Sequence, residues 1–109
     1  MAEYVFSRSN MQLIANITSS GSWTVPSGVT LAMFELTGGG GTLLNNGYRS
    51  TICPVTAGNV FTITLGAAGT STTAGGNSSI TNPNGVIILA AAGQASTTPA
   101  YCKIYSLTS

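Results

Sequence analysis

The chain has 109 residues, a length that fits one domain. Only 5% of the residues are charged, the formal net charge is +1, and there is no histidine. So few Lys and Arg residues exclude a mainly electrostatic binder of nucleic acid or of an anionic membrane. The lack of histidine removes the commonest general base and the commonest metal ligand. We therefore expect no catalytic, cofactor or metal site, no enzyme activity, and no nucleic-acid or membrane partner.

Low charge combined with 43% hydrophobic residues predicts poor solubility for a lone monomer. Abundant Ser, Thr and Asn residues can cover part of the surface, and an assembly can bury the rest. We expect both, and hence a homo-oligomer. Cys53 and Cys102 each lie in a β-prone run and are expected to be buried free thiols, with a disulfide between them as the alternative.

The first half of the chain predicts three β-prone segments. Residues 1–10 are expected to form an N-terminal arm or a first edge strand. Residues 11–18 alternate between apolar and polar positions, with Ile14 as an interruption, and this pattern predicts a half-buried strand. Residues 29–37 are apolar on both parities, which predicts a strand that is covered on both sides.

A glycine run ends this strand and is made of Gly38, Gly39, Gly40 and Gly41. Because glycine loses more entropy on ordering than any other residue, the run indicates a loop or a close approach of two backbones. A phosphate-binding loop is disfavoured because no Lys follows the glycines. Leu43 and Leu44 come next, and Asn46-Gly47 predicts a tight type I′ turn.

The second half of the chain predicts five more strands separated by turns and loops. The continuous apolar run 86–92 is expected to be a buried strand, and the last segment is expected to pair inside a sheet. Residues 56–59 and 82–85 read as turns, and residues 66–77 and 93–100 as small polar surface loops. The strands are expected at 48–55, 60–65, 78–81, 86–92 and 101–107. Together they predict an all-β fold, an antiparallel, jelly-roll-like β-sandwich with long Gly/Ser/Thr loops over residues 11–109.

Four short motifs follow one another between residues 22 and 94. They are WTVPSGV from Trp23, VTAGNVFTITLGAAG from Val55, GGNSSI from Gly75 and AAAGQ from Ala90. In this order they resemble the glycine-rich β-domains of bacteriophage and prophage tail fibres and related virion surface proteins. The glycine runs are shorter here, with Gln94 in place of a further glycine, and this favours a small accessory protein over a fibre tip.

The resemblance implies a non-enzymatic structural protein on the virion surface, assembled in the host cytoplasm. We expect a capsid decoration or cement protein that stabilises the shell by oligomeric packing, with a trimer favoured. Its partner would be the major capsid protein or another virion protein. The alternative is a receptor-binding domain of a tail fibre that recognises a cell-surface glycan.

The candidate interface residues are two aromatic side chains near the start of the chain, a pair of leucines and the glycine run before that pair. Tyr4 and Phe6 would anchor an arm on a neighbour. Leu43 and Leu44 would be buried against a subunit or a shell, with the alternative that their loop folds back on the core of the same chain. The glycines Gly38, Gly39, Gly40 and Gly41 are expected either in a loop at a subunit contact or exposed tip, or in a plain structural turn.

A catalytic role for Glu35 is disfavoured, because a glycosidase would need a second acid close to it. Glu35 is instead expected to pair with Arg49, Arg8 or Lys103 on a strand face. The larger aromatic residues are expected mainly in the core or between subunits, with a sugar-binding platform as the alternative. They are Trp23, Tyr48, Tyr101 and Tyr105.

Overall fold

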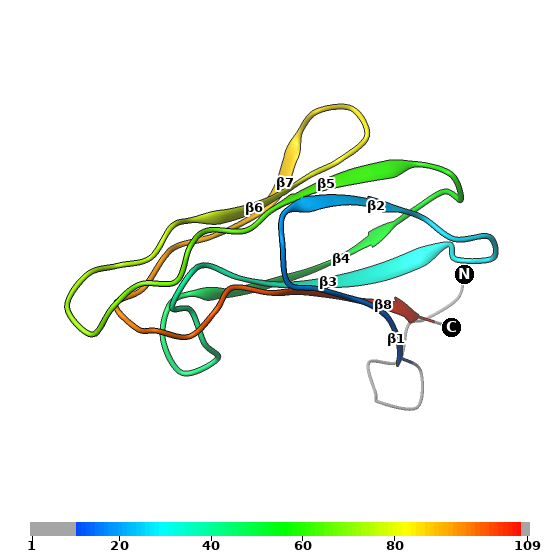
Figure 1. The fold of residues 1–109 in the computed structure, drawn as a ribbon. Coiled ribbons are helices and arrows are strands. Elements are labelled where there is room, and N and C mark those ends of the chain that lie inside the picture. The colour runs from blue at the N-terminus through cyan, green and yellow to red at the C-terminus, as the bar shows by residue number, and fades with distance from the viewer. Residues whose placement is uncertain (1–10, 108–109) are drawn as a thin grey trace.

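Eight strands form two antiparallel four-stranded sheets that stack as two layers in the computed structural model, which describes residues 11–107 (Figure 1). The first sheet has the order β1-β8-β3-β4, with β1 at Met11–Ile17, β8 at Cys102–Leu107, β3 at Leu31–Thr37 and β4 at Tyr48–Pro54. The second has the order β2-β5-β6-β7, with β2 at Gly21–Thr24, β5 at Val60–Thr64, β6 at Ser78–Thr81 and β7 at Ile87–Ala91. The predicted all-β antiparallel sandwich is confirmed.

The core lies between the two sheets and is built from alternate residues of the strands. In β3 the inward side chains are Ala32, Phe34 and Leu36, all fully buried. The second sheet and the neighbouring strands complete the cluster with Trp23, Val25, Phe61, Ile63, Ile80, Cys102 and Ile104. Burying each large side chain of this kind contributes about 1.5–3 kcal/mol, so this shared core holds the layers together.

Strand β3 is buried on both faces, as predicted. Its outward-facing Leu31 and Met33 pack with Leu107 of β8, in a smaller cluster that includes Met11 and Tyr105. The interrupted alternation around Ile14 also has a structural explanation, because the pairing of β1 with β8 shifts register between Leu13 and Ala15. This β-bulge lets β1 contribute to the small outer cluster at its start and to the main core at its end.

Two local predictions are wrong. Residues 86–92 do not form a buried strand, because β7 is the edge strand of the second sheet and Ile87 is 61% exposed. The turn at Asn46-Gly47 is not of type I′, which needs positive φ at both positions, since neither residue has a positive φ. Gly47 is required there for space instead, because a Cβ would collide with the backbone of Gly41.

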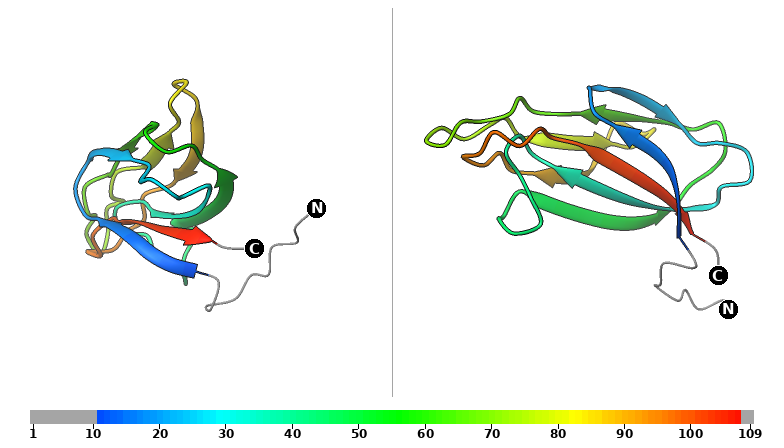
Figure 2. Two further views of the ribbon diagram at one scale, coloured as in Figure 1. Left: turned by 90° about the vertical axis from the view of Figure 1, so that its right-hand side faces the viewer. Right: turned by 60° about the horizontal axis from the view of Figure 1, so that its bottom comes forward.

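Because neighbouring strands are antiparallel, the loops that connect the strands lie at two opposite ends of the sandwich. Loops 38–47, 65–77 and 92–101 project together at one end, which we call the glycine-rich tip (Figures 1 and 2). The opposite end, the turn end, holds the turns 25–30 and 55–59, and the turn 82–86 projects outward from the second sheet on the side away from the tip (Figure 1). Met11 and Leu107 pair with each other at the turn end. The tip is therefore the part of the molecule farthest from both ends of the described chain.

The outer face of the second sheet is rich in hydroxyl groups, as expected for a chain with few charges. Thr62 of β5 lies between Ser22 of β2 and Thr81 of β6, and Thr64 pairs with Ser79. Across residues 11–107 no helix has the length and apolarity to cross a membrane.

Candidate functional site

The glycine-rich tip is the candidate binding site, and hydrogen bonds between main-chain atoms join its three loops. The N–H of Gly39 donates to Gly76 at 2.9 Å, and the carbonyl of Gly39 accepts from Gln94 at 2.8 Å. Gly75 closes the network by donating to Gln94 at 3.0 Å, and Gly40 donates to Thr98 at 2.7 Å. The three loops therefore form one connected platform.

Glycine is required in this platform because the backbones touch. A Cβ on Gly38 would collide with the carbonyl of Ala92, and one on Gly39 with the carbonyl of Ala67. Cβ atoms on Gly75 and Gly93 would likewise collide with main-chain atoms of neighbouring loops. The prediction that the glycine run marks a close approach of backbones is confirmed. All four glycines of the run, Gly38, Gly39, Gly40 and Gly41, are buried inside the tip.

Loop 38–47 displays the predicted apolar pair at the surface. Leu43 is 72% exposed and Leu44 is 99% exposed. The side chain of Asn45 holds the loop, because its Oδ1 accepts from the N–H groups of Thr42 and Gly47, both at 2.9 Å, and its Nδ2 donates to the carbonyl of Gly40 at 3.1 Å. Two large apolar side chains are thus presented to solvent on a loop with a fixed backbone.

The other two tip loops present small hydroxylated side chains. In loop 65–77 the N–H of Thr70 donates to the carbonyl of Thr73 at 2.8 Å, and the Thr70 hydroxyl accepts from the N–H of Thr73 at 2.9 Å. Loop 92–101 is tightened by the hydroxyls of Ser96 and Thr98, which lie 2.9 Å apart. These turns place uncharged polar groups on the other two loops of the tip.

The only described acidic side chain lies behind the tip, on the outer face of the first sheet. Glu35 of β3 accepts a hydrogen bond from the Tyr48 hydroxyl at 2.5 Å. Burial of the phenol and this hydrogen bond raise the pKa of Tyr48 well above its usual value, so Tyr48 keeps the proton that it donates. Burial and the charge of Glu35 also raise the pKa of Tyr101.

The predicted strand-face pairing of Glu35 with Lys103 is found in the register, because Lys103 of β8 stands directly opposite Glu35 of β3, but within residues 11–107 the two side chains form no salt bridge. Arg49 stands opposite Leu36, and thus on the other parity from Glu35, and its guanidinium donates to the carbonyls of Asn46 and Tyr48. The ammonium of Lys103 lies 5.0 Å from the ring centroid of Tyr101. Arg8 lies outside the described residues.

The remaining candidate residues are placed as follows. Trp23 is a core residue, so its ring is not available as a sugar-binding platform. Both cysteines are free thiols as expected, with Cys102 buried and Cys53 half-buried. Tyr4 and Phe6 lie outside the described residues, so their role as anchors stays a prediction.

Sequence reasoning missed Asn45, which does most to fix the leucine loop. The signal was present, since Asn is a residue whose side chain can replace backbone turns, and Asn45 stands between the leucines and a glycine. Within the described part of the chain, no three His, Cys, Asp or Glu side chains gather where they could hold a metal ion. Comparison with protein-family models, with curated proteins and with solved structures finds no match to this chain.

Proposed function

We propose that this chain is a non-enzymatic virion protein that attaches to a protein surface of a phage particle through its glycine-rich tip, as a decoration or cement protein does. In this proposal it sits on the outside of the particle as a homo-oligomer, by preference a trimer, and contacts the major capsid protein or another virion protein. The ordered motifs between residues 22 and 94 support the virion assignment by their resemblance to phage β-domains.

The observation that carries the proposal is the exposure of Leu43 and Leu44 on a fixed loop. Exposed leucines side by side are unfavourable in water, and their burial against a partner would contribute about 1.5–3 kcal/mol for each side chain. The bonds from Asn45 and the packed glycines hold the loop in one conformation, so little conformational entropy is lost on binding. The low charge of the chain leaves few charged groups to desolvate.

A protein that binds only the assembled shell stabilises the shell by mass action. The experiment therefore adds purified full-length chain to shells from a phage or prophage that encodes it, after the native copies have been stripped. Co-sedimentation and the temperature at which the shells break are measured. The wild-type chain should bind and raise that temperature.

A double variant, Leu43→Ser with Leu44→Ser, should keep its stability within about 0.5 kcal/mol, because both side chains are exposed. It should lose at least tenfold in shell affinity. The matched control is Leu13→Ser, which removes a leucine that is 49% exposed on β1, away from the tip. Equal binding by the double variant and the wild type, or no binding by either, would contradict the proposal.

The exposed hydroxyls of Thr70, Ser71, Thr72 and Thr73 favour a second candidate function, a receptor-binding module whose tip contacts a cell-surface glycan. Their backbone is held by the turn from Thr70 to Thr73, so the hydroxyls keep a fixed arrangement. A receptor module should bind cells or purified glycans through this loop and leave shells unchanged. The sedimentation experiment thus separates the two functions.

A further inference from the structure

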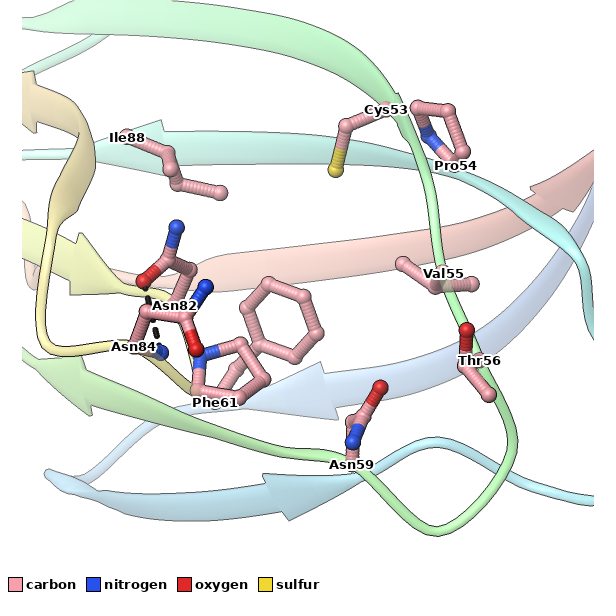
Figure 3. A pocket seen from close by; sticks show the side chains of 10 residues that line it. Cys53, Pro54, Val55, Thr56, Asn59, Phe61, Asn82, Asn84 and Ile88 are labelled. Carbon is pink, nitrogen blue, oxygen red and sulfur yellow. Dashed lines mark hydrogen bonds between the residues drawn. The ribbon is translucent and has the colours of Figure 1, made fainter.

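A cavity of about 260 Å³ lies at the turn end, away from the glycine-rich tip (Figure 3). It opens between β4 of the first sheet and β5 and β7 of the second. Its floor is apolar, with Phe61 and Val55 almost fully buried and Ile88 half-buried. Its rim is polar and is formed by Thr56, Asn59, Asn82 and Asn84. Pockets for drug-sized ligands have volumes of about 300–1,000 Å³. This cavity is slightly smaller, so it suits a ligand the size of a single ring.

Two tight turns hold the rim in place. In the first, the N–H of Asn59 donates to the carbonyl of Thr56 at 3.1 Å, and Gly58 has the positive φ of 89° that such a turn needs. In the second, the Asn82 side-chain oxygen accepts from the N–H groups of Asn84 and Val86, both at 2.9 Å. The backbone of the rim and the side chain of Asn82 are therefore held in place before a ligand arrives.

The rim amides have unused hydrogen-bonding capacity. The oxygen of Asn82 is engaged in the turn, which leaves its NH₂ group to donate. The side-chain amides of Asn59 and Asn84 make no hydrogen bond to another residue in the range 11–107, and each can donate and accept at once. Such groups match the vicinal hydroxyls of a sugar, which also donate and accept.

The described lining of the cavity carries no charge. Among residues 11–107, no Lys, Arg, Asp or Glu lines it, and the one ionisable side chain there is that of Cys53. Burial raises the pKa of the Cys53 thiol, so it stays neutral at ordinary pH. A charged ligand would lose its hydration here without gaining a partner of opposite charge, and this excludes phosphates and free amino acids.

Two neutral ligand classes also fit poorly. A flat aromatic base needs an open ring face on which to stack, but Phe61 is only 4% exposed and packs against Trp23 and Phe34. A hydrocarbon would take water from the rim amides without replacing its hydrogen bonds. A ring with an apolar C–H face and a hydroxylated edge meets both the floor and the rim.

We propose that this cavity binds one neutral sugar ring, whose C–H face lies on the half-buried side chains of Ile88 and Cys53 while its hydroxyls bond to Asn59, Asn82 and Asn84. The site is at the end opposite the tip, so it does not depend on the proposed attachment function. It gives the particle-bound protein a binding site that would stay open at the turn end.

The test uses the full-length ¹⁵N-labelled chain and nuclear magnetic resonance. Glucose, galactose, mannose and N-acetylglucosamine are titrated one at a time to about 50 mM, because a small ligand of this kind binds in the millimolar range. At least one sugar should shift the side-chain amide signals of Asn59, Asn82 and Asn84 in a saturable way. Glucuronate, which adds a charge, should bind at least tenfold more weakly than glucose.

Asn59→Ala and Asn84→Ala should each weaken sugar binding by about fivefold, since each removes one ligand hydrogen bond and none from the fold. The matched control is Asn16→Ala on β1, at the far edge of the first sheet from β4, which should bind like the wild type. Shifts confined to the three tip loops would overturn the proposal. So would no response to any sugar, a response to the peptide analogue N-acetylglycinamide alone, or an equal loss in the control.

Discussion

The indole ring of Trp23 stands at 88° to the phenyl ring of Phe34, with the ring centroids 5.7 Å apart. Trp23 belongs to β2 in the second sheet and Phe34 to β3 in the first, so this edge-to-face contact joins the two layers. Phe61 completes the cluster at 5.2 Å from Phe34 and 5.9 Å from Trp23. Each aromatic pair of this kind contributes about 0.5–1.5 kcal/mol beyond the area it buries.

Phe34→Ala should lower the free energy of unfolding by about 3–5 kcal/mol, because it leaves a cavity between the sheets. Urea denaturation followed by circular dichroism measures the change, and the emission of Trp23, the only tryptophan, should shift to longer wavelength. Phe34→Leu keeps most of the volume and serves if the alanine variant does not fold. A loss below about 1 kcal/mol for Phe34→Ala would contradict the central role of this cluster.

Alanine substitutions of three glycines should separate crowding from backbone strain. Gly39→Ala should cost at least about 2 kcal/mol, because its Cβ collides with the carbonyl of Ala67. Gly85→Ala meets no atom but has a φ of 81°, so it should cost about 1 kcal/mol. Gly21→Ala meets neither obstacle and should be neutral or stabilising by about 0.5 kcal/mol. Urea midpoints measure the change in the free energy of unfolding for each of the three variants. Any other rank order would contradict the close contact of backbones in the glycine-rich tip.

The stability of the protein should fall in alkaline solution. Cys102 is fully buried, and burial raises the pKa of its thiol from 9.0 to about 12. The folded state keeps this proton where the unfolded chain has lost it, so the stabilisation is full below about pH 9 and is lost between about pH 9 and 12. The free energy of unfolding should fall by about 1 kcal/mol per pH unit from this thiol.

The measurement is a series of urea midpoints from neutral pH upward for the wild type and for Cys102→Ala. The variant should be less stable at neutral pH but should show a shallower alkaline fall, since Cys53, Tyr48 and Tyr101 still contribute in both proteins. Parallel pH profiles for the two proteins would show that the Cys102 thiol does not contribute.

Ile87→Lys should reduce self-association at high concentration without changing stability by more than about 0.5 kcal/mol. Ile87 is 61% exposed on β7, an edge strand without a charged residue, and such edges pair with other strands. Light scattering across a concentration series measures the effect. Val60→Lys is the matched control, since it adds the same charge on the interior strand β5, where Val60 is 44% exposed. An equal reduction in both variants would indicate net charge rather than edge pairing.

Most strands could be predicted from the sequence because their burial follows local alternation. In β5, Phe61 and Ile63 point inward while Thr62 and Thr64 face solvent, and this pattern is legible in five residues. The edge position of β7 was not predictable in the same way. A continuous apolar run has no alternation, and its neighbours depend on which strands pair across the whole sheet.

The candidate sites were harder to predict than the strands because each one joins segments far apart in the chain. The sequence places Leu43 and Leu44 in a loop, but the contacts that fix the tip link Gly39 with Gly76 and Gln94. The cavity brings together two turns that lie in separate connections, and no spacing in the sequence shows that Asn59 and Asn84 line the same space.

The glycine packing has a consequence for how the tip could be redesigned. Its outline is set by main-chain atoms that touch one another, whereas positions 71–74, 95 and 97 direct their side chains to solvent. Randomising those positions would alter the chemistry of the surface while the glycines keep its contour. The domain could thus serve as a display scaffold for libraries, with recognition varied at the outward positions and the buried glycines left untouched.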